Sequence, residues 1–275
     1  MRMQVAWIAG FVAALLGQAP ATESPTVADG RNTPVERLES MRGAMKSYEV
    51  TRDGVPPVAV KVQADPVFRS GKQNGNFLDG AIFLWLDAAG RPEAAMEAFL
   101  IGEPDAPNGK WIHEFTSLST ARLVASRDGK PRWYPAEPGI KFQPVPDAPK
   151  PAASPVQRLA QIRELASQFK ADDDYGGGGN WNVLRMLTKP VARYGKAGAT
   201  PEDGALFAFV EKTDPEVFLF IEARPGPNGA EWQYALAPMG CWAVKVKHKD
   251  RPVWELPWRS PGDPTKPLYN YQFWP

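Results

Sequence analysis

Two segments of the chain carry the apolar periodicity of an amphipathic helix, with hydrophobic residues three or four positions apart. The stripes are Leu38, Met41, Met45 and Tyr48 in the first segment, and Leu159, Ile162, Ala166 and Phe169 in the second. Each segment follows a capping residue, Thr33 or Ser154, with Pro next and Glu36 or Gln157 three residues after the cap. A capping box of this kind satisfies the free N–H groups of a first helical turn, so the pattern predicts a helix after each cap.

Runs of apolar and aromatic residues follow each predicted helix. The expected strands are 81–86, 93–101, 111–118 and 123–127 after the first helix, and 205–210, 216–223, 232–239 and 243–247 after the second. Trp133 and Trp254 close the two series. A helix followed by a meander of four to five strands must bury its apolar stripe on one sheet face. The predicted fold class is therefore α+β: two tandem copies of a helix packed on a curved antiparallel sheet, a roll whose element order is similar to that of cystatin-like folds.

Short sequence blocks recur along the chain and indicate a tandem duplication. Residues 33–38 recur as 154–159, an offset of 121, and residues 79–83 recur as 203–207, an offset of 124. Trp111 matches Trp232 at the first offset. The changes in offset fall in connections between predicted elements, where insertions are tolerated.

Residues 1–21 have the pattern of a signal peptide. Arg2 precedes an apolar run over 5–16, and the segment 19–21 is Ala-Pro-Ala, which favours cleavage after Ala21. We therefore expect an exported protein, periplasmic or extracellular, without lipidation because no Cys follows the run. The run is short for a bilayer span, so no membrane span is expected after signal removal. An uncleaved N-terminal anchor is the alternative.

The remaining chain divides by composition. Expected parts are a disordered linker over 22–33, a first roll over 34–134, a Pro-rich linker over 135–153, a second roll over 154–257 and an aromatic, Pro-rich tail over 258–275. The Pro-rich linker favours extended polyproline II, which either holds the copies apart or crosses the surface of one copy. The tail either packs on its own protein or docks on a partner.

Composition narrows the chemistry. Lys and Arg number 32 against 31 Asp and Glu, so nothing favours nucleic acid as a partner. With one Cys and two His, an intrachain disulfide and a Cys-rich or His-rich metal site are not expected. We expect no metal and no cofactor. The acidic run 172–174 with Asn180 is interpreted as a solvated loop at a helix end, with calcium as a weaker alternative.

Candidate site residues come from the polar positions that recur in both copies. They are Arg69 with Arg193, Asp79 with Asp203, Glu93 with Glu216 and, if a slip of one residue is allowed, Glu97 with Glu222. Turns and cross-strand ion pairs account for such a set. The functional alternative places Glu222 with Arg224, or Glu222 with Asp203, in an acid–base site. Trp242 and Trp258 have no match in the first copy, and aromatic side chains often provide contact area for a ligand. The candidate binding residues are Glu222, Arg224, Asp203, Trp242 and Trp258.

The second copy resembles a group of uncharacterised exported bacterial proteins. The resemblance rests on DGALFAFV at 203–210, TDPE at 213–216, IEAR at 221–224 and WQYALA at 232–237. The first copy keeps this pattern only loosely. The resemblance implies that homologues exist, but the group has no assigned activity, cofactor or catalytic residue, so it transfers no site.

Three functions are compatible with these patterns. The favoured one is an exported non-catalytic protein of duplicated rolls, a binding or structural module of the cell envelope, with an unknown ligand or envelope protein as partner. A carboxylate-dependent exported hydrolase, acting on glycans, is the alternative, so the chain is not assigned as an enzyme or a non-enzyme. The third is an accessory protein that binds a partner through its tail and the basic strand around Lys245, Lys247 and Lys249.

Overall fold

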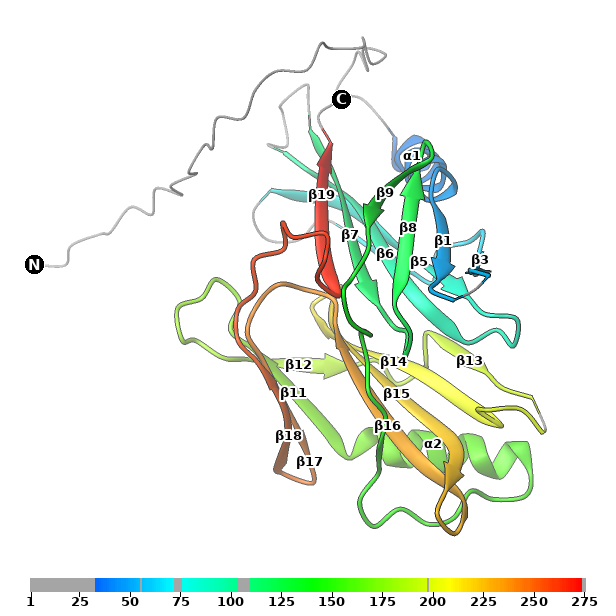
Figure 1. The fold of residues 1–275 in the computed structure, drawn as a ribbon. Coiled ribbons are helices and arrows are strands. Elements are labelled where there is room, and N and C mark those ends of the chain that lie inside the picture. The colour runs from blue at the N-terminus through cyan, green and yellow to red at the C-terminus, as the bar shows by residue number, and fades with distance from the viewer. Residues whose placement is uncertain (1–32, 55, 72–75, 103–108, 197, 274–275) are drawn as a thin grey trace, which may run out of the picture.

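The computed structural model describes residues 33–54, 56–71, 76–102, 109–196 and 198–273. The expected signal peptide, the mature N-terminus at Thr22 and the linker up to residue 32 lie outside these residues. The described chain is mostly antiparallel sheet, with α1 (Pro34–Lys46) and α2 (Pro155–Ser167) in its two halves (Figure 1). We call residues 33–134 the first unit and residues 154–256 the second unit.

Both helices begin at the predicted caps. The Thr33 hydroxyl accepts a bond from the Glu36 N–H, and the Glu36 carboxylate accepts one from the Thr33 N–H at 2.7 Å. Ser154 caps α2 by accepting the Gln157 N–H at 3.2 Å, but its hydroxyl donates to the Gln157 amide oxygen. The second box is therefore only half formed.

The first unit contains two sheets. Its strands are β1 (Glu49–Arg52), β2 (Val58–Ala59), β3 (Lys61–Val62), β4 (Phe68–Ser70), β5 (Phe77–Leu86), β6 (Pro92–Ile101), β7 (Lys110–Ser117), β8 (Leu123–Arg127) and β9 (Lys130–Trp133). One sheet has the order β2-β1-β8-β9. The other has the order β19-β7-β6-β5-β3, with β4 also paired to β5.

The second unit forms one sheet with matching strand neighbours. Its strands are β11 (Phe169–Asp173), β12 (Asn182–Met186), β13 (Ala192–Tyr194), β14 (Asp203–Glu211), β15 (Asp214–Gly226), β16 (Gly229–Pro238), β17 (Val244–His248) and β18 (Arg251–Leu256). The order β16-β15-β14 matches β7-β6-β5, and β11-β17-β18 matches β1-β8-β9. The strands predicted from the sequence are present in both units. The predicted meander did not include β1 and β11, which directly follow the helices. The sequence predicted that the acidic run 172–174 forms a solvated loop at the helix end. This prediction is wrong, because Asp172 and Asp173 belong to the strand β11.

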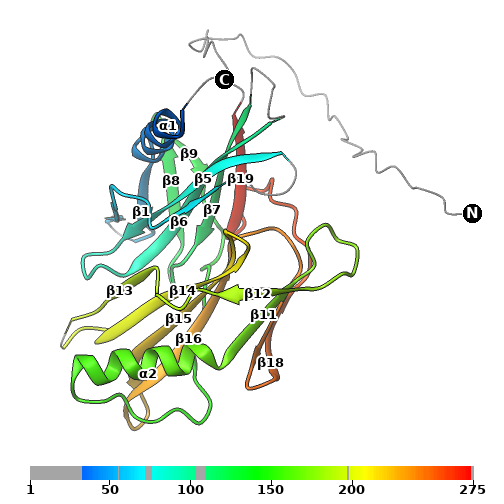
Figure 2. The same cartoon turned by 180° about the vertical axis from the view of Figure 1, so that it is seen from behind.

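The two units pack sheet against sheet, with their helices on the outer faces (Figures 1 and 2). Ile82 and Leu84 of β5 point into a shared core with Leu206 and Phe220 of the second unit. Alternate residues of the same strands point the other way, toward the helices, as Phe83 does toward Met41 and Met45. The strands read as nearly continuous apolar runs because both of their faces are buried.

The linker and the tail both return to the folded body. Within the linker, β10 (Gln143–Pro144) pairs with β16, and Ile140 and Val145 are buried. The linker thus crosses the surface of the second unit. In the tail, β19 (Leu268–Phe273) pairs antiparallel with β7 of the first unit, and the Trp133 indole donates to the Lys266 carbonyl at 2.8 Å. The last strand of the chain therefore completes a sheet formed near its start (Figure 1).

Candidate functional site

Asp79 and Asp203 anchor the two helices to their sheets. Asp203 accepts bonds from Arg158 of α2 at 3.0 Å and from Arg193 of β13 at 3.0 and 3.2 Å. Arg193 also donates to the Pro155 carbonyl in the first turn of α2. In the first unit Asp79 accepts hydrogen bonds from Arg37 of α1 at 2.7 Å and from Arg69 of β4 at 2.8 Å. Arg69 also donates to the Pro34 carbonyl in the first turn of α1. The candidate Asp203 is therefore part of a buried helix clamp that is present in both units.

Glu222 lies at the interface between the units, with no exposed surface. One of its oxygens accepts bonds from the Arg91 Nε at 2.9 Å and the Tyr194 hydroxyl at 2.8 Å, and the other accepts Arg224 Nη1 at 2.6 Å. Arg91 comes from the first unit and also binds Glu93 at 2.9 Å. We call Arg91, Glu93, Tyr194, Glu222 and Arg224 the Arg91 cluster.

The Arg91 cluster pairs its buried opposite charges, although the Arg91 Nη2 has no hydrogen-bond partner. Burial disfavours the guanidinium charge of Arg91, but attraction to Glu222 and Glu93 outweighs this effect and raises the pKa of Arg91. Its guanidinium carbon lies 4.9 Å from the centre of the Phe220 ring and 5.4 Å from that of Phe142. This arrangement stabilises the contact between units but leaves no free carboxylate oxygen on Glu222.

The candidates Glu222 and Asp203 do not share a site. Gly204 is the cross-strand partner of Glu222, and a Cβ at Gly204 would meet the Glu222 side chain. Asp203 precedes Gly204 in β14 and bonds to α2 on the other face of the sheet, since neighbouring strand residues point opposite ways. The structure brings Glu222 together with Arg224 and separates both from Asp203.

A cavity of about 280 Å³ lies elsewhere on the boundary between the units. Four carboxyl side chains line it: Glu97 of β6, Glu114 of β7, and Asp214 and Glu216 of β15. No Lys or Arg among the described residues lines it. We call it the acidic cavity.

Burial favours the protonated forms of these carboxyl groups. It raises the pKa of Glu114 to about 8 and that of Asp214 to about 7, and it raises the pKa of Glu97 and Glu216 well above the usual range. Like charges around the cavity add to this effect, because each carboxylate makes the next harder to ionise. Arg259 is the nearby cation, but its guanidinium donates to the carbonyls of Gly240 and Pro257.

Glu216 has a buried carboxyl oxygen without a partner. It is 3% exposed, and its Oε2 has no hydrogen-bond partner. A buried polar atom without a partner costs free energy, so it points to a missing partner. Aromatic side chains complete the walls: Phe77 and Phe99 stack with centroids 5.5 Å apart, and Tyr175 and Trp242 lie 4.9 Å apart.

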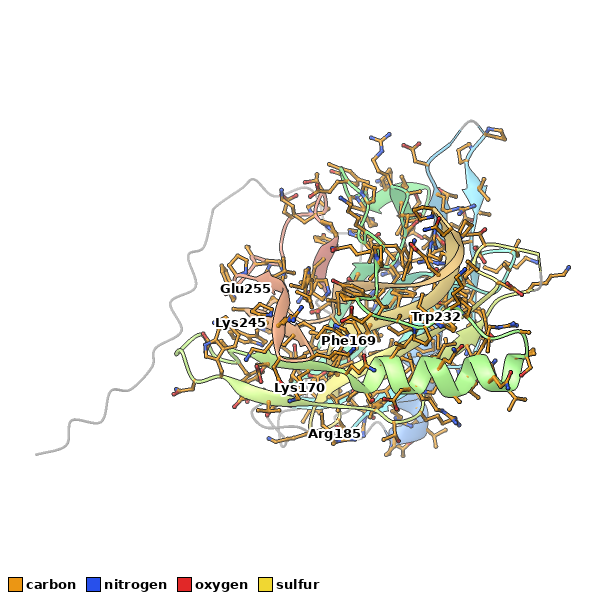
Figure 3. All side chains as sticks on the ribbon, turned by 90° about the horizontal axis from the view of Figure 1, so that it is seen from below. Phe169, Lys170, Arg185, Trp232, Lys245 and Glu255 are labelled. Carbon is orange, nitrogen blue, oxygen red and sulfur yellow. The ribbon has the colours of Figure 1, made fainter. Side chains whose placement is uncertain are left out.

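The other candidate residues lie apart from the acidic cavity, except for Trp242, which lines it. Arg224 lines a larger cavity of about 620 Å³ between the linker and the second unit. Trp258 is 55% exposed on the tail. In the basic strand, Lys245 lies over the Trp181 ring at 3.8 Å and 3.7 Å from Glu255, its neighbour in Figure 3.

His113 and Cys241 are the other side chains near these sites that could take part in acid–base or nucleophilic chemistry. His113 accepts or shares a hydrogen bond with the Tyr48 hydroxyl at 3.0 Å, and burial lowers its pKa to about 3, so it is neutral. Cys241 lines the acidic cavity, and burial raises the pKa of its thiol to about 12. A protonated thiol is a poor nucleophile.

The sequence identified Glu97 and Glu216 only as repeated polar positions, and it missed Glu114 and Asp214. Comparison with family models, curated proteins and solved structures finds no significant match to the chain. Within the described ranges, no group of three His, Cys, Asp or Glu side chains is placed to hold a metal ion. The helices that the structure describes are too short or too polar to cross a membrane.

Proposed function

We propose that the protein is an exported, non-catalytic binding module made of two duplicated α+β rolls, with the acidic cavity as its ligand site. The observation that carries the proposal is a cavity with four buried carboxyl groups, one of which, Glu216, has an oxygen without a partner. Ligand pockets are concave, mostly apolar and equipped with a few convergent polar groups. Carboxyl groups beside Phe77, Phe99, Tyr175 and Trp242 match that description.

Duplication accounts for the arrangement of the two units. The helix clamps use Asp79 and Asp203 at an offset of 124, and their helix arginines, Arg37 and Arg158, are offset by 121. The strand orders around β5 and β14 also match. When a sheet is duplicated, the equivalent faces of the two copies can pack against each other. The two sites at the boundary between them can then acquire different side chains.

The volume of the cavity favours a small ligand. At about 280 Å³ it is near the lower end of typical ligand pockets, about 300–1,000 Å³. A polymer chain does not fit inside it. The binding module therefore takes a small molecule, or the end group of a larger one, rather than a protein surface.

A binding screen tests this function. Thermal unfolding of the protein is followed with small cationic, neutral and anionic compounds, since a ligand at about 100 times its Kd stabilises the fold by about 2.7 kcal/mol. We expect stabilisation that disappears in Cys241→Phe, which fills the cavity, and persists in Val183→Phe at an exposed strand position. No stabilisation by any compound would refute the binding function.

A carboxylate-dependent hydrolase is the second candidate, and one observation favours it. Glu114, with a pKa of about 8, is a protonated acid beside a cavity at neutral pH, which is what a general acid requires. Turnover of small glycosides or esters that is lost in Glu114→Gln and kept in Glu222→Gln would establish this activity over simple binding.

A further inference from the structure

The Arg91 cluster and the acidic cavity occupy matching positions in the two units. Arg91-Pro92-Glu93 corresponds to Asp214-Pro215-Glu216 at the start of β6 and β15. The backbone confirms the register, because the Leu118 N–H donates to the Glu93 carbonyl at 2.9 Å and the Met239 N–H donates to that of Glu216 at 2.7 Å. Glu93 and Glu216 thus have the same place in each unit.

The partners of the two glutamates differ. One carboxylate oxygen of Glu93 accepts a hydrogen bond from Arg91, and the other accepts one from the Ser119 hydroxyl at 2.5 Å. In the second unit Asp214 stands at the position of Arg91, and Gly240 stands at that of Ser119. Neither Asp214 nor Gly240 has a side-chain donor like those of Arg91 and Ser119, which explains why Glu216 Oε2 has no hydrogen-bond partner.

Each site also has a second carboxylate from the other unit, but these two carboxylates do not occupy equivalent positions. The register that matches Gly80 with Gly204 places Phe99 at the position of Glu222, and Glu97 lies two residues earlier on the same strand face. Glu222 accepts the Tyr194 hydroxyl, and Glu97 is bonded by the Ser70 hydroxyl at 3.4 Å, where Ser70 and Tyr194 are offset by 124. In the first site the guanidinium of Arg91 bridges the two carboxylates. In the second site Glu216 and Glu97 both border the acidic cavity, and no guanidinium among the described lining residues bridges them.

We infer that the acidic cavity binds a small organic cation with a guanidinium group, which bridges Glu97 and Glu216 as Arg91 bridges Glu222 and Glu93. This inference rests on the proposed binding function and names its ligand class. A planar guanidinium has N–H groups on several sides and can donate hydrogen bonds to two carboxylates at once. Aromatic rings in the wall of a cavity attract a delocalised cation. The Arg91 guanidinium lies against Phe220 and Phe142, and the cavity offers Phe77, Phe99, Tyr175 and Trp242.

A bare metal ion fits the cavity less well. Divalent cations take several oxygen ligands at short distances. The described side chains place no three acidic, His or Cys groups for such a purpose, and the cavity is much larger than an ion. The rings of Phe77, Phe99 and Trp242 in its wall supply no ligand to calcium or magnesium.

Calorimetric titration with butylguanidine tests the inference, with butanol, butylamine and magnesium chloride as comparison probes. We expect butylguanidine to bind, and butanol and magnesium not to bind. Burial favours the protonated acid in the ligand-free protein, and a guanidinium favours the carboxylate, so binding of the cation releases a proton from Glu216. Gln cannot become a carboxylate, so we expect Glu216→Gln to weaken that binding about tenfold or more. Asp263→Asn, at a carboxylate on an exposed turn, is the matched control and leaves the affinity unchanged.

A second variant keeps the test decisive if Glu216→Gln alters the fold. Asp214→Arg supplies the missing guanidinium from the chain itself, at the position that Arg91 has in the first site. We expect this variant to unfold at a higher temperature than the wild type and to bind no butylguanidine. Equal binding by the wild type and this variant, or tighter binding of butanol or magnesium, would overturn the inference. If butanol or magnesium binds more tightly, the cavity still binds a ligand, so the proposed binding function stands and only the guanidinium inference fails. If no probe and no screened compound binds, the binding function and the inference both fail.

Discussion

Glu222 and Glu216 show how two buried carboxyl groups on one strand acquire opposite electrostatic states. Glu222 receives three donors, two of them arginines, and is held as an ion-paired group. Glu216 faces Asp214, Asp173, Glu114 and Glu97, and burial with these neighbours raises its pKa. Three donors around one carboxylate stabilise a structure, whereas an unsatisfied carboxyl beside a cavity is available to a ligand.

Removing the charge of Glu222 tests the structural role of the Arg91 cluster. In Glu222→Gln the buried guanidinium of Arg91 loses its main partner, and breaking a buried ion pair typically costs about 3–5 kcal/mol. We expect a loss of about 3 kcal/mol in the free energy of unfolding, measured by urea denaturation. The affinity for butylguanidine should stay the same. An unchanged stability would contradict this role.

The acidic cavity also predicts how stability depends on pH. The groups that face it or lie beside it are Glu97, Glu114, Asp173, Tyr175, Glu211, Asp214, Glu216, Cys241 and Arg259. Folding raises the pKa of Glu114 to about 8 and that of Asp214 to about 7, so the folded state binds more protons than the unfolded state between about pH 4 and 8. The contribution of these carboxyl groups to stability is then fully present at the low end of this window and falls as pH rises through it.

We expect the unfolding temperature of the ligand-free protein to drop by at least about 3 °C between pH 5 and pH 8, equivalent to about 1 kcal/mol. Calorimetry at several pH values measures it. Glu114→Gln removes one of the titrating groups and should flatten the dependence. A stability that rises over this range would show that the cavity carboxyls are ionised in the folded protein.

At the scale of elements, local patterns predicted most of the fold. Capping residues and apolar stripes predicted both helices, because a cap and a helical face are each set by residues within a few positions. The long strands were predicted by their apolar runs. β1 and β11 were missed because they are short and mix polar with apolar residues, as the sequence Glu-Val-Thr-Arg of β1 shows. Their strand state depends on pairing with β8 and β17 more than 70 residues away.

The site was harder to predict for a related reason. An apolar run looks the same whether its second face packs on a helix or on another sheet, so the sequence did not show that Ile82 and Leu206 share a core. Glu114 and Asp214 meet only through that packing. The available signal was weak: Glu97 lies inside a strand otherwise rich in apolar side chains, and Glu114 lies between His113 and Phe115 in a mixed strand. Such positions rarely bury a carboxyl without a purpose.

The helix clamps give a prediction about paired elements. In Asp79→Asn and in Asp203→Asn, two arginines lose a buried carboxylate and the first turn of the helix loses its tie to the sheet. We expect each change to lower the free energy of unfolding by about 3 kcal/mol. Urea denaturation of the two variants, with Asp263→Asn as the control, measures both effects. A large effect in one unit and none in the other would argue against equivalent clamps.

At the scale of the whole molecule, the chain closes on itself. The tail strand β19 pairs with β7 in the first unit, and its Asn270 lines the acidic cavity beside Glu114. The cavity is thus made by both units and by the last described strand together. A site that depends on three distant parts of the sequence forms only when the molecule is complete.

Removal of residues 258–275 tests this dependence. Without the tail, β7 becomes an exposed sheet edge, the Trp133 indole loses its bond to Lys266, and the cavity loses the wall that contains Asn270. We expect the shortened protein to unfold at a lower temperature, to associate in size-exclusion chromatography and to bind butylguanidine at least about tenfold more weakly, because one wall of the site is gone. A synthetic peptide of residues 258–275 should restore monomeric behaviour and affinity when added to it, since strand pairing at an open edge recovers the same main-chain bonds. A shortened protein with full stability and affinity would instead mean that the tail is a separate docking segment for a partner.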